Sequence, residues 1–389
     1  MDDLLSASAT ALAEKIRSKQ VSSVEVVTAN LNRINEVNPA LNAVVQIVAE
    51  RALSEAAACD SELARGEIRG PLHGAPFTLK DSHDTEGIIS TGGTTGRSEH
   101  VPDADSPPTA RLRAAGGVLL GKTNTPELTF AGFTDNLIYG RTSNPYDLGR
   151  TPGGSSGGAA AIVASGGSPF DLGSDTRGSI RGPANNCGIA GLKPTSGRVP
   201  RTGHIVPPGG LRDAFTAIGP LARRVEDLTL IFPLIAGPDW RDPYMVDMPI
   251  GRPSDVDIKK LRVATYDDNG LWTPTTEIKA AVGNAAASVA DAGAAVTDIL
   301  PAAVTRATAL SLEGRVAVAT GDASGIGTRT ADGGAYTRML LERYGTTRLS
   351  PKIQSGLDNE GALDANSLAR FLNAIDLVAG GDAGVHGGV

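Results

Sequence analysis

Apolar positions in the first part of the chain recur at the spacing of amphipathic helices. Residues 8–18 and 23–36 each carry one apolar face, and a capping box at Ser22 begins the second of these segments. Pro39 is expected to end that helix, because proline lacks the N–H that a continuing helix requires. A third helix, rich in alanine, is predicted for residues 48–65. We expect these helices to pack around the outside of the core and assign them no chemistry.

Further along the chain, short apolar runs alternate with helical patterns. Buried strands are predicted for residues 75–81 and 117–120, and helices for residues 107–115, 159–164 and 225–236. A later segment contains a predicted strand, helix and strand at residues 261–266, 276–292 and 295–299. This order predicts an α/β crossover, which we expect to lie on the same sheet.

Composition and charge restrict the class of partner. The 389 residues carry a net charge of -7, and charges of both signs are scattered, which argues against nucleic acid or an anionic membrane as partner. The acidic start is not a secretory signal, and the longest apolar stretch, 228–236, is too short to span a bilayer. Two widely spaced cysteines fit a reducing cytoplasm, where we expect the protein. No histidine has a metal-ligand spacing with another His or Cys, so no metal is expected.

Candidate chemistry concentrates in residues 151–198, where several serines lie among closely spaced glycines. Such glycines allow tight turns and close approach of the backbone to another group. Backbone N–H groups in these turns can point at an anion, as an acyl-transfer intermediate requires. The stretch therefore indicates a catalytic centre.

Several motifs of the chain resemble the amidase signature family. The strongest are Gly153–Gly158 (GGSSGG) and Gly178–Arg181 (GSIR), and further matches occur in the same order as in that family, at Gly74–Asp81, Gly121–Asn124, Glu127, Asn144–Pro145 and Cys187–Thr195. The likeness covers most of residues 1–240. It implies an α/β fold in which a mixed central sheet is flanked by helices.

The resemblance also implies a catalytic triad. Ser179 would be the nucleophile, Ser155 the bridging serine preceded by a cis peptide bond, and Lys80 the base. A serine hydroxyl is a weak nucleophile and needs a neighbouring group to take its proton. Lysine can serve only if burial lowers its pKa enough to populate the neutral amine. Ser155 can both accept and donate a hydrogen bond, so it can pass the proton between Ser179 and Lys80.

The oxyanion hole of the family is formed by main-chain N–H groups, which correspond here to Thr176, Arg177, Gly178 and Ser179. The family usually has glycine at the position of Arg177. If this position requires a positive φ, arginine strains the loop; if it does not, a long cation lies beside the acyl pocket. In the second case Arg177 would favour substrates with a carboxylate, because arginine pairs with carboxylates in a bidentate manner.

By this resemblance, residues 1–389 form one amidase-signature domain. It would have N-terminal helices at 1–65, a signature core at 70–200, an atypical glycine-rich insertion at 310–330 and a shortened C-terminal end. The expected reaction is hydrolysis of a small-molecule carboxylic amide to carboxylate and ammonia or amine, through an acyl-enzyme and without a cofactor. A homodimer is a further expectation. Two alternatives remain open, namely an amidotransferase-type subunit that supplies ammonia within a complex, and a catalytically impaired protein of the same fold.

Three other glycine-rich patterns suggest different functions. Residues 116–123 match a phosphate loop, but the residues between its glycines are strand-like. Residues 153–157 match the nucleophile elbow of α/β-hydrolases, with His204 or His386 as base, but no hydrophobic strand precedes them. Residues 312–327 resemble the dinucleotide-binding turn of short-chain dehydrogenases, but that family's tyrosine and lysine are absent. We favour none of these three alternatives.

Overall fold

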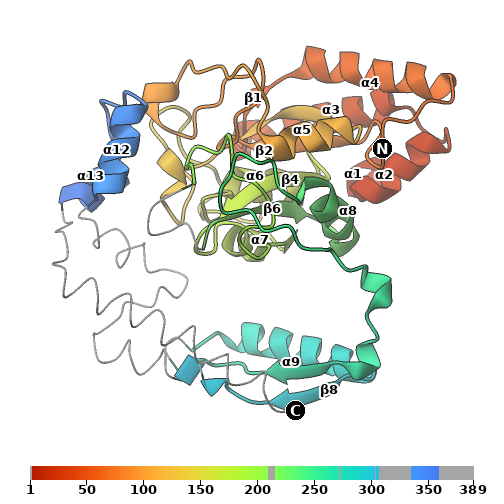
Figure 1. Cartoon of the computed structure of the whole chain (residues 1–389), viewed down its shortest axis with the longest axis vertical. Coiled ribbons are helices and arrows are strands. Elements are labelled where there is room, and N and C mark those ends of the chain that lie inside the picture. The colour runs from red at the N-terminus through yellow and green to blue at the C-terminus, as the bar shows by residue number, and fades with distance from the viewer. Residues whose placement is uncertain (1, 209–214, 271–272, 303, 306–333, 359–389) are drawn as a thin grey trace. The chain divides into compact units, whose positions relative to one another are not determined.

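The computed structural model describes residues 2–208, 215–270, 273–302, 304–305 and 334–358 (Figure 1). The chain divides into two compact units. Unit 1 is Met1–Pro249 with Gly334–Asn359, and unit 2 is Ile250–Gly333 with Glu360–Val389. The single domain expected from the sequence stays a prediction. The insertion expected at 310–330 and the C-terminal end lie outside the described residues.

Unit 1 contains a six-stranded mixed sheet with the strand order β1-β3-β2-β4-β6-β5. Its strands are β1 (Val44–Ile47), β2 (Pro76–Lys80), β3 (Val118–Thr123), β4 (Phe170–Asp175), β5 (Ala190–Gly191) and β6 (Ala217–Ala222). β2 pairs in parallel with both β3 and β4, whereas β1, β5 and β6 pair antiparallel to their neighbours. The predicted α/β class with a mixed central sheet is therefore confirmed.

Helices accompany the sheet in unit 1 (Figure 1). They are α1 (Asp2–Ser6), α2 (Ala9–Arg17), α3 (Ser23–Leu41), α4 (Ala49–Ala64), α5 (Pro107–Ala114), α6 (Gly157–Ala164), α7 (Arg181–Asn186), α8 (Val225–Ile235), α12 (Ala335–Arg343) and α13 (Pro351–Asp358). Short 3-10 turns occur at Thr95–Arg97 and Glu127–Thr129 in unit 1, and at Pro253–Asp255 and Ile258–Lys260 in unit 2. No helix among the described residues combines the length and the apolar character needed to cross a membrane.

The predicted capping box begins α3. The Ser22 hydroxyl accepts the N–H of Glu25, and the Glu25 carboxylate accepts the N–H of Ser22 at 2.8 Å. The prediction that Pro39 ends this helix is wrong, because α3 continues to Leu41. In the last turn, proline removes one backbone hydrogen bond without stopping the helix, which ends where Asn42 takes a left-handed φ of 50°.

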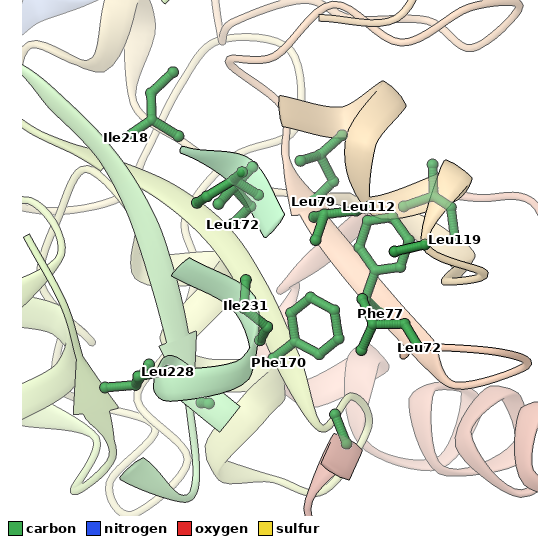
Figure 2. Close-up of a cluster of buried hydrophobic side chains, with 14 of the residues drawn as sticks. Leu72, Phe77, Leu79, Leu112, Leu119, Phe170, Leu172, Ile218, Leu228 and Ile231 are labelled. Atoms are coloured by element: carbon green, nitrogen blue, oxygen red, sulfur yellow. The ribbon is translucent and has the colours of Figure 1, made fainter. Parts of the chain in front are cut away.

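Successive side chains of β3 point to opposite faces of the sheet. Leu119 belongs to a core cluster with residues of α5 and α8, whereas Val118 and Leu120 belong to a cluster with residues of α3, α4 and α6. In the first cluster, the rings of Phe77 and Phe170 stack with centroids 5.4 Å apart (Figure 2). Each such buried ring stabilises the fold by about 2 kcal/mol. Both faces of the sheet are therefore covered.

Unit 2 contains the predicted crossover. It consists of β7 (Arg262–Thr265), α9 (Thr276–Asp291) and β8 (Ala295–Asp298), and the two strands pair in parallel. The expectation that this crossover lies on the main sheet is wrong for the described residues, where β7 and β8 form a separate two-stranded sheet. The short strands pair with each other in register from Arg262↔Ala295 to Thr265↔Asp298.

Candidate active site

The site lies at the carboxyl ends of the parallel strands β2 and β4. Lys80 is the last residue of β2 and Asp175 is the last residue of β4. Leu79 points into the core cluster shared with α5 and α8, so strand alternation places Lys80 on the opposite face, where α6 packs. The Lys80 side chain is completely buried. Its carboxyl-end position is the usual place for functional residues in such sheets.

Burial changes the protonation of Lys80. Removal from water lowers the pKa of Lys80 to about 7, while the negative charges of Asp175 and Asp171 oppose this effect. Asp171 is also buried, and burial raises its pKa to about 6, against the hydrogen bonds it receives. One of these is from Thr123, whose hydroxyl donates to Asp171 Oδ2 at 3.0 Å. Near neutral pH, Lys80 can therefore exist as the neutral amine.

Ser155 faces Lys80 from the loop that leads into α6. Lys80 Nζ donates to Ser155 Oγ at 2.7 Å, and the peptide bond between Gly154 and Ser155 is cis. Glycine is required at position 154 because a Cβ would lie 2.6 Å from the nitrogen of Phe133 and 2.7 Å from the oxygen of Ala131. This close backbone contact fixes the loop beside the lysine.

Ser179 lies in the turn between β4 and α7. Ser156 N–H donates to the Ser179 carbonyl at 3.1 Å, which joins this turn to the Ser155 loop. Among the described residues, no hydrogen bond connects the hydroxyls of Ser155 and Ser179. The structure thus brings the two serine segments together through the backbone and brings Ser155 into direct contact with Lys80.

Asp175 organises the turn that carries Ser179. It accepts the backbone N–H groups of Gly178 and Ile180 at 2.7 and 3.1 Å. It also accepts two hydrogen bonds from the Arg181 guanidinium, both at 3.0 Å. Burial alone would raise the pKa of Asp175, but these hydrogen bonds hold it below its usual value. Asp175 is therefore an ionised anchor for the turn.

The turn accommodates arginine at position 177 without backbone strain. Arg177 does not have a left-handed φ, and the left-handed angle falls instead on Gly178, at 120°. Thr176 contacts Thr216 through their hydroxyls at 3.0 Å. The Gly178 N–H, which the family resemblance would place in the oxyanion hole, donates to Asp175. Of the two expectations for Arg177, strain in the loop is therefore wrong.

Two buried side chains extend the site beyond the residues predicted from sequence. Ser174 Oγ accepts a hydrogen bond from Lys80 Nζ at 3.0 Å. His204 Nε2 lies 3.0 Å from the same oxygen. His204 thus contacts Ser174, not the serine at the centre of the elbow-like motif. His386, the other base considered for that motif, lies outside the described residues. No strand precedes the motif, because residues 148–152 form turns and loop.

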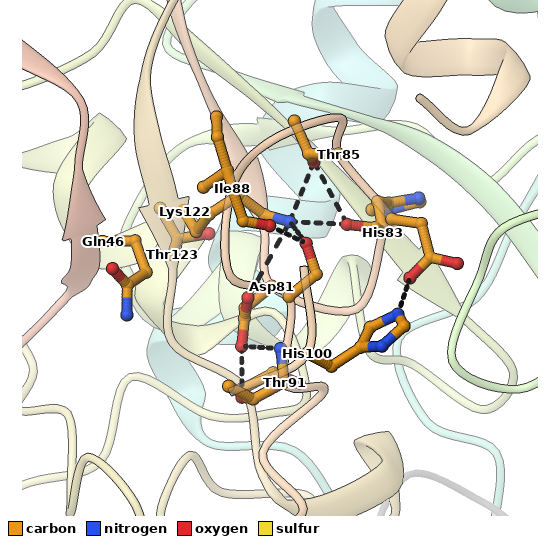
Figure 3. Close-up of polar contacts among 12 residues, drawn as sticks. Gln46, Asp81, His83, Thr85, Ile88, Thr91, His100, Lys122 and Thr123 are labelled. Atoms are coloured by element: carbon orange, nitrogen blue, oxygen red, sulfur yellow. Dashed lines mark hydrogen bonds and ion pairs between the residues drawn. The ribbon is translucent and has the colours of Figure 1, made fainter. Parts of the chain in front are cut away.

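A second buried lysine, Lys122, lies on the neighbouring strand (Figure 3). Its ammonium group donates to the carbonyl of His83 and to the hydroxyls of Thr85 and Ser90, and lies 3.8 Å from Asp81 Oδ1. Lys122 belongs to β3, so the segment that matches a phosphate loop contains a strand where that motif requires a loop. The structure therefore gives no support for nucleotide binding there.

Cys59, Glu62 and His73 are the one group among the described residues whose side chains approach one another closely enough to hold a metal ion. Protein partners already engage the histidine and the carboxylate. His73 Nδ1 accepts the N–H of Arg69, and its Nε2 lies 3.1 Å from the Cys59 carbonyl. Glu62 forms a bidentate ion pair with Arg69. The cluster fits a hydrogen-bonded structural contact better than a ligand set.

Fold and site together define a class of protein, an α/β protein in which a buried lysine at a strand end faces serine-bearing glycine-rich turns. A model of the amidase family matches residues 25–369, and the chain belongs to this family, as the amidase-signature motifs predicted.

Relatives and solved structures agree with this assignment. An acylamidase of Rhodococcus erythropolis is 40% identical over 297 residues, which cover 76% of this chain and 61% of that protein. A glutamyl-tRNA(Gln) amidotransferase subunit of Synechococcus sp. (strain CC9605) is 40% identical over 293 residues, 74% of this chain and 58% of that protein. Fatty acid amide hydrolase matches in structure with a TM-score of 0.82 at 27% identity, covering 99% of this chain and 66% of that one. The chain thus spans less than two thirds of the length of either curated relative.

Proposed function

We propose that this protein hydrolyses a carboxylic amide to a carboxylate and ammonia or an amine. Ser179 is the nucleophile, Ser155 passes the proton, and Lys80 is the base. The observation that carries the proposal is the 2.7 Å contact between Lys80 Nζ and Ser155 Oγ in a site where Lys80 is completely buried. Its pKa of about 7 supports a base that works near neutral pH.

The proton takes a short route through the site. The neutral Lys80 amine accepts the Ser155 hydroxyl proton, and Ser155 in turn takes the proton of Ser179 as Ser179 Oγ attacks the amide carbon. When the carbon–nitrogen bond breaks, the same route returns this proton to the leaving nitrogen. Ser179 then carries the acyl group as an ester. A water molecule attacks the ester and gives a proton to the same base, which passes it to the Ser179 oxygen as the bond between that oxygen and the acyl carbon breaks. The released acid loses its remaining proton to give the carboxylate, and both Ser179 and the base are restored.

The turn of residues 176–179 is the proposed oxyanion hole. Backbone N–H groups there can stabilise the charge that develops on the carbonyl oxygen. Because Gly178 N–H already donates to Asp175 at 2.7 Å, it can serve the oxyanion only by sharing its hydrogen. The N–H groups of Thr176, Arg177 and Ser179 complete the assignment. Asp175 then positions the hole and takes no part in proton transfer.

A pocket of about 220 Å³ lies next to the backbone that touches Gly154. Ala131 and Phe133 belong both to this pocket and to the segment against Gly154. The other apolar side chains of the pocket include Phe130, Leu137 and Ile353. We assign it to a small apolar or aromatic group of the substrate.

Ammonia release from a panel of aliphatic and aromatic primary amides tests the proposal. We expect activity in the parent protein and its loss in Ser179→Ala and Lys80→Ala. Ser61→Ala, an exposed serine on α4, is the control and should retain full activity. Equal turnover by Ser179→Ala and the parent would refute the proposal. Activity that appears only in Arg177→Gly would support the catalytically impaired alternative instead.

A second candidate function is to supply ammonia as one member of a multi-protein complex. The Synechococcus relative named as part of a glutamyl-tRNA(Gln) amidotransferase, 40% identical over 74% of this chain, favours it. Glutamine as the preferred amide, together with partner proteins that co-purify with the chain, would select this function. Turnover of simple amides by the isolated chain, without a preference for glutamine, would select the first. The homodimer and the cytoplasmic location stay predictions.

A further inference from the structure

Lys80 has a second polar contact besides Ser155. The Ser174 hydroxyl accepts from Lys80 Nζ at 3.0 Å, and His204 Nε2 lies 3.0 Å from the same hydroxyl oxygen. Ser174, His204 and Lys80 are all buried. A continuous chain of contacts therefore runs from the amine through Ser174 to the imidazole, separate from the contact to Ser155.

His204 is held on both of its ring nitrogens. Nδ1 lies 3.1 Å from the nitrogen and 3.2 Å from the oxygen of Val206, while Nε2 faces Ser174. Burial, together with the positive charge of Lys80, lowers the pKa of His204 to about 3. The ring is therefore neutral throughout the working pH range and has one donor and one acceptor nitrogen. Its charge therefore does not change when Lys80 takes up a proton.

Direction matters for a lysine that acts as a base. The neutral amine has one lone pair and two N–H groups, and the lone pair must point at Ser155 if that serine is to give up its proton. An acceptor that holds an N–H group elsewhere turns the lone pair toward Ser155. Ser174 supplies such an acceptor, provided that its own hydroxyl hydrogen does not turn toward the amine. We assign the ring hydrogen of His204 to Nδ1, where the Val206 carbonyl can accept it, so that Nε2 accepts the hydrogen of the Ser174 hydroxyl and fixes the hydroxyl in this role.

We propose that Ser174 and His204 are positioning residues that orient the Lys80 amine toward Ser155. This inference rests on the proposed function, in which Lys80 is the base. His204 acts on Lys80 only through Ser174, and neither residue touches the substrate.

Other charged and titratable groups also face this chain of contacts. They are Asp171 and Asp175 near Lys80, His83, whose ring centroid lies 5.2 Å from that of His204, and Arg97 and Arg201 near His204. His83 is buried, and burial lowers its pKa well below the usual value, so it is neutral as well. The two aspartates act on the Lys80 charge directly, and the variants proposed next leave them unchanged.

The test compares Ser174→Ala, His204→Phe and the double variant with the parent. We expect each single variant to lower kcat by about 10- to 100-fold with KM unchanged, because misplacement of a catalytic group by about 1 Å has effects of this size. The double variant should be no slower than the slower single variant, since both changes remove the same alignment. Ser174→Thr and His204→Gln keep hydrogen-bonding groups and should recover most of the rate. His100→Phe, a histidine outside this cluster, is the control.

The pH profile of kcat/KM distinguishes a positioning role from a merely structural role, because loss of a structural contact would leave this profile unchanged. Loss of Ser174 removes an acceptor for the ammonium form of Lys80, so its pKa falls and the acid limb of kcat/KM moves to lower pH. In His204→Phe, the freed Ser174 hydroxyl can donate to the amine lone pair, which moves the limb in the same direction. Multiplying effects in the double variant would overturn the inference. So would a lower melting temperature with an unchanged pH profile.

Labelling by a fluorophosphonate separates this inference from the proposed function. We expect Ser179 of the parent to react, Lys80→Ala to react far more slowly, and the Ser174 and His204 variants to lie between the two. If Ser174→Ala and His204→Phe react as fast as the parent while Lys80→Ala does not, the positioning role is wrong and the proposed function stands. If the parent and Lys80→Ala react equally, the proposed function fails, and the positioning role fails with it.

Discussion

The charge of Asp171 gives a quantitative test of how the protein sets the pKa of Lys80. Asp171 pairs with Thr78 across β2 and β4, so it lies on the same face as Lys80, two residues along the neighbouring strand. Strand spacings place the two residues on the order of 8 Å apart. At an effective dielectric constant of about 20, two unit charges at that distance interact by about 2 kcal/mol. This energy corresponds to a change of about 1.5 in the pKa of Lys80.

Asp171→Asn removes this charge while its amide oxygen can still accept from Thr123. Above its pKa of about 6, Asp171 is ionised and favours the charged form of Lys80. The substitution should therefore lower the pKa of Lys80, and the acid limb of kcat/KM should move from about 7 to about 5.5. Asp291→Asn, at the end of α9, is the control. A limb that stays in place or moves to higher pH in Asp171→Asn would refute the electrostatic reasoning.

Two further predictions concern stability. Lys122→Met should lower the free energy of unfolding by about 3–5 kcal/mol, because it leaves the buried Asp81 carboxylate without the cation that lies 3.8 Å away. Urea denaturation at neutral pH measures this free energy. A loss below about 1 kcal/mol would contradict the prediction. Gly158→Ala places a Cβ 2.4 Å from the backbone nitrogen of Asn124, so we expect a large drop in melting temperature or loss of soluble protein. Gly283→Ala is the control, because a Cβ there would meet nothing within 4 Å, and its melting temperature should equal or slightly exceed that of the parent. Equal melting temperatures of the two alanine variants would show that the predicted clash at Gly158 is absent.

Local patterns predicted much of unit 1. The helices at 8–18 and 48–65, and the strand that ends near Lys80, were predictable because apolar periodicity and caps act over a few residues. Pro39 was misjudged because the cost of proline depends on its place in the helix, and in the last turn the cost is small. The sheet to which β7 and β8 belong was not predictable, because strand partners are chosen by contacts distant in sequence.

In the candidate site too, some residues belong to local motifs, whereas others come together only in the folded chain. Lys80, Ser155 and Ser179 were proposed from motifs that are contiguous in sequence, whereas Ser174 and His204 approach Lys80 only after the sheet has formed. No short spacing links residues 80, 174 and 204. A weaker signal was present in β4, where polar Asp171, Ser174 and Asp175 lie in a strand that is buried at every position. Polar side chains on such a strand need partners, so they point to a site.

Two lysines are buried in the part of the chain that the structure describes, and their partners favour Lys80 over Lys122 as the proposed base. Lys122 lies 3.8 Å from the Asp81 carboxylate and donates to three further oxygens, and its pKa falls only to about 8, as burial is offset first by Asp81. Lys80 contacts two neutral hydroxyls and has no carboxylate within ion-pair distance among the described residues, and its pKa falls to about 7. Burial is complete for both side chains, so the two sites differ in their partners, a carboxylate beside Lys122 and hydroxyls beside Lys80. A nearby carboxylate favours the charged form of a buried lysine, whereas neutral hydroxyls do so less, which supports Lys80 as the proposed base.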